Sequence, residues 1–159
     1  MQKITPFLWF DGKAEEAMNF YVSVFKNSRI VSVTRHGEAG PGPKGSVMSG
    51  VFELDGVEFY ALNGGPMFQF TPAISFFVKC ESQEEIDDLW EKLSEGGGKN
   101  RCGWLWDKFG VSWQIVPASL GELLQGKDAG KSNRVMQAML QMDKLDIAVL
   151  RKAGEPASE

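Results

Sequence analysis

The sequence predicts an α+β fold in which a βαβββ module occurs twice and is followed by C-terminal helices. Three observations predict this fold. The order strand, helix, strand, strand, strand can be read twice along the chain, short motifs recur in the same order in both halves, and the residues after 118 change to a helical pattern. The recurring motifs are a Thr-Pro pair before an aromatic strand, a Glu-Glu pair at a helix start, and a glycine turn before the last strand (Thr5-Pro6 and Thr71-Pro72, Glu15-Glu16 and Glu84-Glu85, 54–59 and 108–113).

We expect these elements to form a single domain over residues 1–159. Module one is expected at 1–66, module two at 67–118 and a C-terminal helical extension at 119–153. A chain of 159 residues is long enough to bury a sizeable core, since domains typically contain about 100–200 residues.

Module one begins with an aromatic strand at 3–10. Apolar residues at helical spacing predict an amphipathic helix over 13–26, and alternating apolar and polar residues predict a half-buried strand over 29–35. The segment 36–46 is too rich in glycine and proline for regular structure. The module closes with two strands around the turn signal Asp55-Gly56 (47–54 and 57–62).

Module two opens with a strand at 73–80. Ser82 and Glu85 have the spacing of a capping box, which satisfies free N–H groups at a helix start, and Gly96-Gly97-Gly98 ends that helix. Short strands at about 99–106 and 111–116 follow, joined by a turn around Asp107-Lys108-Phe109-Gly110. We interpret this turn as structural, with Gly110 supplying the unusual backbone angle and Asp107 bonding its own turn.

The tail has a helical pattern. Ser132 is the expected N-cap of a helix, and a shorter helix is expected over 144–152. The methionines at 136, 139 and 142 are compatible with an adaptable binding surface, and also with a helix packed on its own core or on a dimer partner. We favour the second interpretation. One face of the first helix is expected to carry Val135, Met136, Met139 and Leu140.

Composition and charge exclude several classes of protein. Hydrophobic residues make up 43% of the chain, which excludes wholesale disorder. The net charge is −4 and no basic run occurs, so we expect no nucleic-acid partner. No segment approaches the roughly 20 apolar residues that span a bilayer, so we expect no membrane partner. A signal peptide is not recognisable and the two cysteines form no disulfide framework, which predicts a cytoplasmic location.

The chain contains a single histidine, His36. No Ser-His-Asp or Cys-His site can be built without it, and a metal site with two histidines cannot be built at all. His36 stands at the start of the glycine-rich loop 36–46. This loop is compatible with a lid over a cleft and with a plain exposed loop.

Five segments carry a recognisable family pattern: ITPFLWFDGKAEEAMNFYVSVF, FELDGVEFYALNGGP, QEEIDDLWEKLSEGG, CGWLWDKFGVSWQIVP and RVMQAMLQMDKLDIAVL. Together they resemble the PhnB-like family, whose members are often labelled demethylubiquinone methyltransferase. This family belongs to the vicinal oxygen chelate superfamily of glyoxalase I and bleomycin-resistance proteins. The resemblance covers nearly the whole chain. It implies two βαβββ modules forming a curved mixed sheet around a cleft, and a homodimer.

The resemblance also implies where metal ligands would stand. In metal-dependent relatives, His, Gln and Glu side chains on equivalent strands hold a divalent ion. The equivalent positions here are Pro6, Tyr60, Ala73 and Gln114. These residues offer one phenol and one amide, which are poor substitutes for carboxylates or imidazoles. We therefore expect no metal and no other cofactor. Methyl transfer, as the family label suggests, has no support in a strand–helix glycine motif.

Strand alternation predicts the lining of the cleft. If Gln114 faces the cleft, so do Ser112 and Val116, while Trp113 and Ile115 pack against a helix. Tyr60 brings Glu58 and Leu62 with it. On the first strand of module two, Ala73 brings Ser75 and Phe77, and Trp104 and Trp106 are expected on the same side. Such an aromatic cavity with few polar groups suits a planar or apolar small molecule. The predicted substrate-binding residues, none of them assigned a catalytic role, are Glu58, Tyr60, Ser75, Cys102, Trp104, Trp106 and Gln114.

Several alternatives stay open. Trp104 and Trp106 are equally compatible with core or dimer-interface positions, and Cys102 with a nucleophile or a buried small side chain. Glu58 would be a general base if buried, or an exposed strand carboxylate. Two other functions remain: an enzyme with a divalent metal at Glu58, Gln114 and His36, and an interaction module in which the C-terminal helices matter most.

Overall fold

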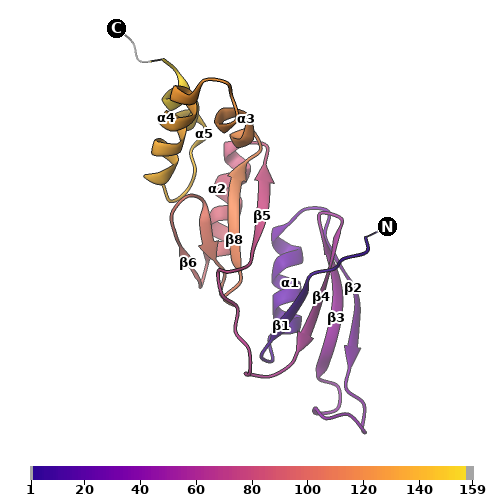
Figure 1. Ribbon diagram of the computed structural model, residues 1–159. Coiled ribbons are helices and arrows are strands. Elements are labelled where there is room, and N and C mark those ends of the chain that lie inside the picture. Colours follow the sequence, from indigo (N-terminus) through magenta and orange to yellow (C-terminus); the bar gives the residue numbers. More distant parts are fainter. Residues whose placement is uncertain (1, 157–159) are drawn as a thin grey trace. The chain divides into compact units, whose positions relative to one another are not determined.

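The computed structural model describes residues 2–156 and has the predicted α+β class (Figure 1). The chain divides into two compact units, Met1–Gln69 and Phe70–Glu159, called unit 1 and unit 2 below. Each unit contains a four-stranded mixed sheet, and unit 2 carries three further helices.

Unit 1 has the element order β1, α1, β2, β3, β4. In its sheet the strands lie in the order β1-β4-β3-β2; β1 pairs with β4 in parallel, and the other pairs are antiparallel. Strand β2 and both strands of the hairpin begin where the sequence predicts. The bounds are β1 Phe7–Phe10, α1 Ala14–Val24, β2 Arg29–Arg35, β3 Val47–Leu54 and β4 Val57–Asn63.

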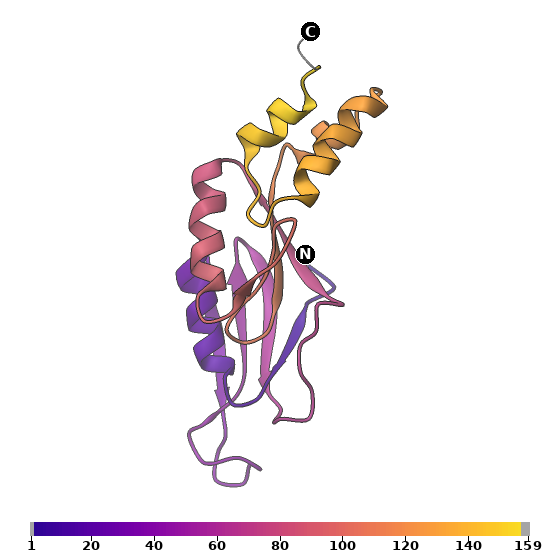
Figure 2. The same ribbon diagram turned by 90° about the vertical axis from the view of Figure 1, so that its left-hand side faces the viewer.

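Helix α1 covers one face of the unit 1 sheet, as Figures 1 and 2 show. Its apolar stripe includes Met18 and Tyr21, which are fully buried, and the Tyr21 ring stacks on Phe52 of β3. Gly50 lies beneath Met18, where a Cβ atom would collide with the Met18 side chain. Among the described residues of unit 1, α1 is the only helix, so the opposite face of this sheet has no helix of its own unit on it.

Unit 2 repeats the arrangement with the order β5, α2, β6, β7, β8. Its strand order, β5-β8-β7-β6, matches that of unit 1, with β5 and β8 parallel. The two βαβββ modules are therefore confirmed at the level of topology. The bounds are β5 Ser75–Cys80, α2 Gln83–Ser94, β6 Gly98–Lys99, β7 Trp104–Trp106 and β8 Ser112–Pro117.

The capping box of module two is present at the start of α2. The Ser82 hydroxyl accepts a hydrogen bond from the Glu85 N–H at 3.1 Å. The Glu85 carboxylate accepts one from the Glu81 N–H at 2.9 Å, one residue before the N-cap. The helix buries Ile86, Leu89, Trp90 and Leu93 against its sheet, as their spacing predicts.

Three predicted strands were wrong at their ends, and one of them, expected from residue 73, begins at Ser75. The first strand begins at Phe7, not at residue 3, because Pro6 has no N–H to donate to a ladder. The span 99–106 contains two strands, β6 and β7, with a turn between them. Cys102 and Gly103 in this turn both have positive φ, at 61° and 83°, which breaks the strand.

The C-terminal helices are α3 Leu120–Leu124, α4 Ala129–Leu140 and α5 Ile147–Gly154. The predicted cap at Ser132 was wrong. Asp128 caps α4, since its carboxylate accepts a hydrogen bond from the Lys131 N–H at 3.1 Å. Ser132 lies inside the helix and donates to the Leu124 carbonyl at 2.9 Å. Helix α3 was not predicted, and α5 begins after Asp146.

The predicted face of α4 was partly wrong as well. Val135 is buried, but Met136 and Leu140 are 38% and 48% exposed. Met139 packs inward as predicted, and Ala138 joins it in place of Met136 and Leu140, so the buried stripe is rotated relative to the prediction. Within residues 2–156, no helix is long and apolar enough to cross a membrane.

Candidate functional site

The face of the unit 2 sheet opposite α2 carries most of the predicted site residues. The register aligns Phe77 of β5, Gln114 of β8 and Trp104 of β7 in one row across the sheet. Ser75, Ser112 and Trp106 form the adjacent row. Residues in register share a face, so Ser75, Trp104, Trp106 and Gln114 come together as alternation predicts. We call this surface the open face.

The residues that alternate with these on β7 and β8 point to the opposite face and are buried there. Trp113 and Ile115 of β8 are buried on the α2 side, as predicted, and Leu105 of β7 is buried between the two tryptophans of that strand. By contrast, Phe77 is 54% exposed and Gln114 is only half-buried. The open face therefore presents aromatic surface with an amide in its middle.

Ser75 and Gln114 contact each other. The Gln114 Nε2 donates a hydrogen bond to the Ser75 Oγ at 3.0 Å. This bond leaves the Gln114 carbonyl oxygen, one amide N–H and the serine O–H for other partners. An adjacent acceptor and two donors, flanked by Phe77 and Trp104, can orient the polar edge of a planar molecule.

Trp106 takes a less central position than its neighbour Trp104. Its indole ring lies over Gly98 of the edge strand β6, where a Cβ atom would collide with the ring. The ring is 44% exposed and leans away from β8, because β6 and β8 flank β7 on opposite sides. Trp106 therefore forms the outer rim of the open face.

Cys102 is not brought to the open face. It lies in the turn before β7, and its thiol donates to the Met139 carbonyl of α4 at 3.6 Å. The Cys102 N–H donates to the Met142 carbonyl at 2.8 Å. No base that would activate a nucleophile is among these partners, so the structure favours the packing role for this thiol.

Glu58 and Tyr60 lie in unit 1, on the face of its sheet opposite α1. Tyr60 is opposite Phe7 of β1, and the two rings meet edge to face with centroids 5.8 Å apart. The Glu58 carboxylate accepts a hydrogen bond from the Thr5 hydroxyl at 3.4 Å. The Gln2 side chain bonds both the N–H and the carbonyl of Glu58. The face of the unit 1 sheet opposite α1 therefore presents the Tyr60 ring beside Phe7, and a Glu58 carboxylate that is bonded to Thr5.

His36 and Glu58 lie at opposite ends of strand β3. The His36 N–H donates to the Ser46 carbonyl just before β3, whereas Glu58 is opposite Glu53 near the end of β3. A strand of this length separates them by about 20 Å. The hypothesis of a metal held jointly by Glu58, Gln114 and His36 is wrong in this chain for that reason.

The positions that the resemblance assigns to metal ligands do not fit a divalent ion. Pro6 and Ala73 have no side-chain donor atom, and both precede their strands. Tyr60 and Gln114 supply one phenol and one amide, in different units. Across residues 2–156, no three or more His, Cys, Asp and Glu side chains are grouped so that they could hold a metal ion.

The turn between β7 and β8 has a structural role, as predicted. Its carboxylate also accepts a hydrogen bond from outside the turn, which was not predicted. Asp107 is 1% exposed and accepts hydrogen bonds from the Phe109 and Val111 N–H groups at 2.9 and 3.0 Å. Its other oxygen accepts from the Trp113 indole at 2.9 Å. Gly110 has φ +89°. This buried carboxylate fixes β7 against β8 and so positions Trp104 beside Gln114.

Residues 2–116 match the family described as 3-demethylubiquinone-9 3-methyltransferase. The chain belongs to this family. A solved PhnB protein from Bacillus cereus is 48% identical, with a TM-score of 0.69, over 74% of this chain and 100% of that chain. No curated protein matches the chain.

Two more distant structures share the fold. PA1353 from Pseudomonas aeruginosa is 21% identical with a TM-score of 0.62, over 74% of this chain and 98% of that chain. FosX, a fosfomycin resistance protein from Listeria monocytogenes solved with Mn(II) and sulfate, is 14% identical with a TM-score of 0.55, over 78% and 95%. At these identities the likeness shows the glyoxalase-like fold alone.

Sequence reasoning placed two further residues, Phe77 and Val116, on the cleft side of the sheet, but it did not predict what lies next to them. Phe77 is the register partner of Gln114, but that pairing is long-range and has no local signal. Val116 shares the face with Gln114, yet it is 3% exposed because the C-terminal helices cover it. The alternation of β8 places Val116 on this face, but only the packing of the tail explains its burial.

Proposed function

We propose that this protein binds a planar, largely apolar small molecule on the open face of unit 2 without a metal ion. The observation that carries the proposal is the Gln114–Ser75 hydrogen bond set between Phe77 and Trp104. The aromatic side chains provide the apolar contact surface, and the amide and hydroxyl orient one polar edge of the ligand. Family membership does not name the ligand or a reaction.

Exposed aromatic surface supports two further parts of the proposal. Phe7 is 58% exposed on the unit 1 face that carries Tyr60 and Glu58, so we propose that this face, by itself, also contacts a small molecule through these two residues. Exposed apolar side chains of this size are typical of surfaces that bind ligands or partners. We therefore propose a homodimer, as the family resemblance implies. A cytoplasmic location fits the two unpaired cysteines, Cys80 and Cys102.

The test is a binding screen with fused-ring phenols, quinones and hydrocarbons. Binding is measured by thermal shift and by tryptophan fluorescence, to which Trp104 contributes. We expect the best ligand to lose about tenfold in affinity in Gln114→Ala and in Trp104→Ala. Gln137→Ala is the matched control, because Gln137 is exposed on α4, and it should bind normally.

Two outcomes contradict the proposal. One is the absence of binding across the whole panel. The other is binding that depends on an added divalent ion and disappears with a chelator, which elemental analysis of the purified protein would detect independently. A mass of twice the chain in sedimentation would support the homodimer, and a monomer would contradict it.

Methyl transfer is a second candidate, favoured by the description of the family alone. The glycines of the chain do not link a strand to a following helix in the pattern of nucleotide-binding turns. Transfer of a labelled methyl group from S-adenosylmethionine to a phenol or catechol tests this candidate. Transfer lost in Gln114→Ala would support it, and no transfer to any acceptor that binds would exclude it.

A further inference from the structure

The open face of unit 2 is closed at one end. Val116 follows Gln114 by two residues on β8, so both side chains belong to the same face. Gln114 is half-buried, whereas Val116 is 3% exposed. Its register partner on β5, Lys79, is exposed at the edge of the sheet. The surface that accepts a ligand therefore stops at the level of Val116.

The C-terminal helices cover Val116. Its side chain belongs to a buried cluster with Val135 of α4, Leu150 of α5 and Leu145 of the connection between them. Partly buried apolar residues complete the cluster (Leu120, Leu123, Leu124, Ala138, Met139 and Met142). Figures 1 and 2 show α3, α4 and α5 gathered beyond the end of β8. We call the segment Leu120–Gly154 the end wall.

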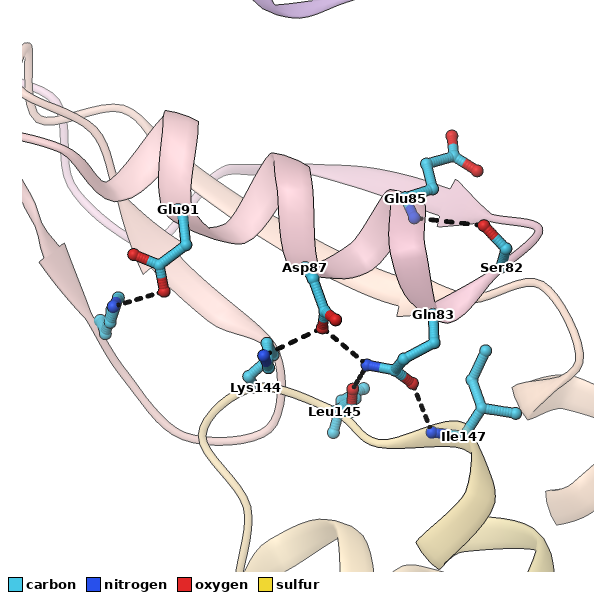
Figure 3. A network of polar contacts seen from close by, with 9 residues as sticks. Ser82, Gln83, Glu85, Asp87, Glu91, Lys144, Leu145 and Ile147 are labelled. Carbon is cyan, nitrogen blue, oxygen red and sulfur yellow. Dashed lines mark hydrogen bonds and ion pairs between the residues drawn. The ribbon is translucent and has the colours of Figure 1, made fainter.

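A polar clamp fixes the end wall to α2, as Figure 3 shows. The Gln83 amide nitrogen donates to the Leu145 carbonyl at 3.0 Å, and its oxygen accepts from the Ile147 N–H at 2.8 Å. The same nitrogen donates to Asp87 at 3.0 Å, and Lys144 pairs with Asp87 at 2.9 Å. One side chain thus bonds the backbone on either side of Asp146, the residue that follows buried Leu145 and caps α5.

A second attachment joins the end wall to the strand that carries Trp104. The N–H groups of Cys102 and Gly103 donate to the carbonyls of Met142 and Asp143, both at 2.8 Å. The Gly103 carbonyl in turn accepts from the Ile115 N–H at 2.7 Å. A Cβ at Gly103 would approach the Ile115 carbonyl and the Leu145 side chain, so only glycine fits there. The wall is therefore held directly beside the row of Gln114 and Trp104.

The end wall lies outside the family match, which ends at residue 116. The Bacillus cereus PhnB structure is covered completely by 74% of this chain. We infer that the end wall is the specificity element of this chain: it limits the length of the planar ligand that the open face accepts. This inference rests on the proposed function and adds a size limit set by α3, α4 and α5.

The experiment compares 2-naphthol with 2-anthrol, which carries the same hydroxyl on a ring system longer by one fused ring. Wild-type protein is expected to bind 2-naphthol at least about tenfold more tightly. Gln83→Ala, which removes the clamp, should reduce this preference, while Gln137→Ala on the exposed side of α4 should retain it. Labelling of Cys102 by N-ethylmaleimide reports wall opening, because its thiol lies against Met139, and buried Cys80 serves as the internal control.

The outcomes separate the role of the end wall from the proposed function. Faster labelling of Cys102 together with loss of the preference in Gln83→Ala supports the end wall. If labelling does not change, Leu145→Ala, which removes the buried side chain beneath the clamp, is measured in the same way. Equal binding of both phenols by the wild type, or an unchanged preference once Cys102 is freed, overturns the end wall but not the proposed function. Failure of both phenols to bind, in a protein that binds nothing else in the panel, overturns the proposed function and the end wall with it.

Discussion

The Gln114 side chain on β8 donates a hydrogen bond to the Ser75 hydroxyl on β5 at 3.0 Å. The two residues are diagonal neighbours across a parallel strand pair, since Ser75 is opposite Ser112 and Gln114 is opposite Phe77. A bond of this kind between half-buried groups contributes about 0.5–1.5 kcal/mol. Its geometry also fixes which atoms of the amide face a ligand.

The first prediction concerns this pair. In a double-mutant cycle of Ser75→Ala and Gln114→Ala, the free energies of unfolding should show a coupling of about 1 kcal/mol. Chemical denaturation measures it. A cycle of Ser75→Ala with Gln137→Ala, on exposed α4, should be additive to within about 0.5 kcal/mol. A coupling near zero for the first pair would mean that the bond contributes nothing in solution.

The second prediction concerns the buried carboxylate of Asp107. Asp107→Ala removes the acceptor of three hydrogen bonds, including that of the Trp113 indole, and leaves these donors buried. We expect a loss of about 2–4 kcal/mol in unfolding free energy and a change in tryptophan fluorescence. Asp88→Ala, which breaks only an exposed pair with Lys92, should cost less than about 0.5 kcal/mol. Similar effects of the two substitutions would refute the structural role of Asp107.

The third prediction uses two glycines with different surroundings. A Cβ on Gly97 would collide with the backbone of Trp106 and Asp107, so Gly97→Ala should cost about 1–3 kcal/mol. Gly121 lies in α3, and a Cβ added there would meet nothing within 4 Å, so Gly121→Ala should be neutral or stabilising by up to about 1 kcal/mol. Thermal unfolding compares the variants. A Gly97→Ala variant as stable as the wild type would contradict the close approach of this segment to the backbone of Trp106 and Asp107.

The fourth prediction concerns pH and the clamp of the end wall. Hydrogen bonding from Gln83, together with Lys144, lowers the pKa of Asp87 below its ordinary value. The stabilisation is therefore complete above the pKa of the unfolded chain, near 3.9, and is lost as the pH falls through the lower folded pKa. Because Asp87 is half exposed, it amounts to less than about 1 kcal/mol.

The comparison of wild type with Asp87→Asn isolates this contribution. Wild type should be the more stable protein at neutral pH, and the difference in unfolding free energy should shrink below about pH 4. Protection of the Cys102 and Gly103 amides against hydrogen exchange, measured relative to the intrinsic exchange rate at each pH, should fall in the same acidic range if the clamp holds the end wall. A difference that is constant with pH would contradict the charge of Asp87 as its source.

The fifth prediction concerns Cys80, which is buried at the end of β5. Burial, followed by the charges of Glu85 and Glu81, raises the pKa of Cys80 from 9.0 to about 12. The unfolded thiol ionises first as the pH rises, so the stabilisation is complete below pH 9 and is lost progressively towards pH 12. Cys80→Ala should show a flatter decline of stability over this range. An identical slope in both proteins would contradict the raised pKa.

Much of the fold follows from local signals in the sequence. The turn at Asp55-Gly56, the box at Ser82 and Glu85, and the apolar spacing of α2 each depend on residues that are close in the chain. The repeated order of elements was sufficient to predict two modules with the same topology. Errors occurred where two local signals competed, as at Asp128 and Ser132, of which Asp128 caps the helix.

The sequence predicted only part of the candidate site. Alternation along β8 and β7 correctly placed Gln114 and Trp104 on one face, because the period of a strand is a local property. Cys102 was grouped with them by proximity in sequence, but its left-handed backbone turns the thiol towards α4. No strand period applies to a residue in a turn.

The sequence by itself determined the α+β class, the doubled module and the alternating faces, since these depend on turn residues and on periodicity. Only the tertiary structure decided that Phe77 stands opposite Gln114, that Val116 is covered, and that Gln83 clamps the tail. These relationships join residues far apart in the chain. They depend on strand register and helix packing, which the whole fold sets and no local pattern encodes.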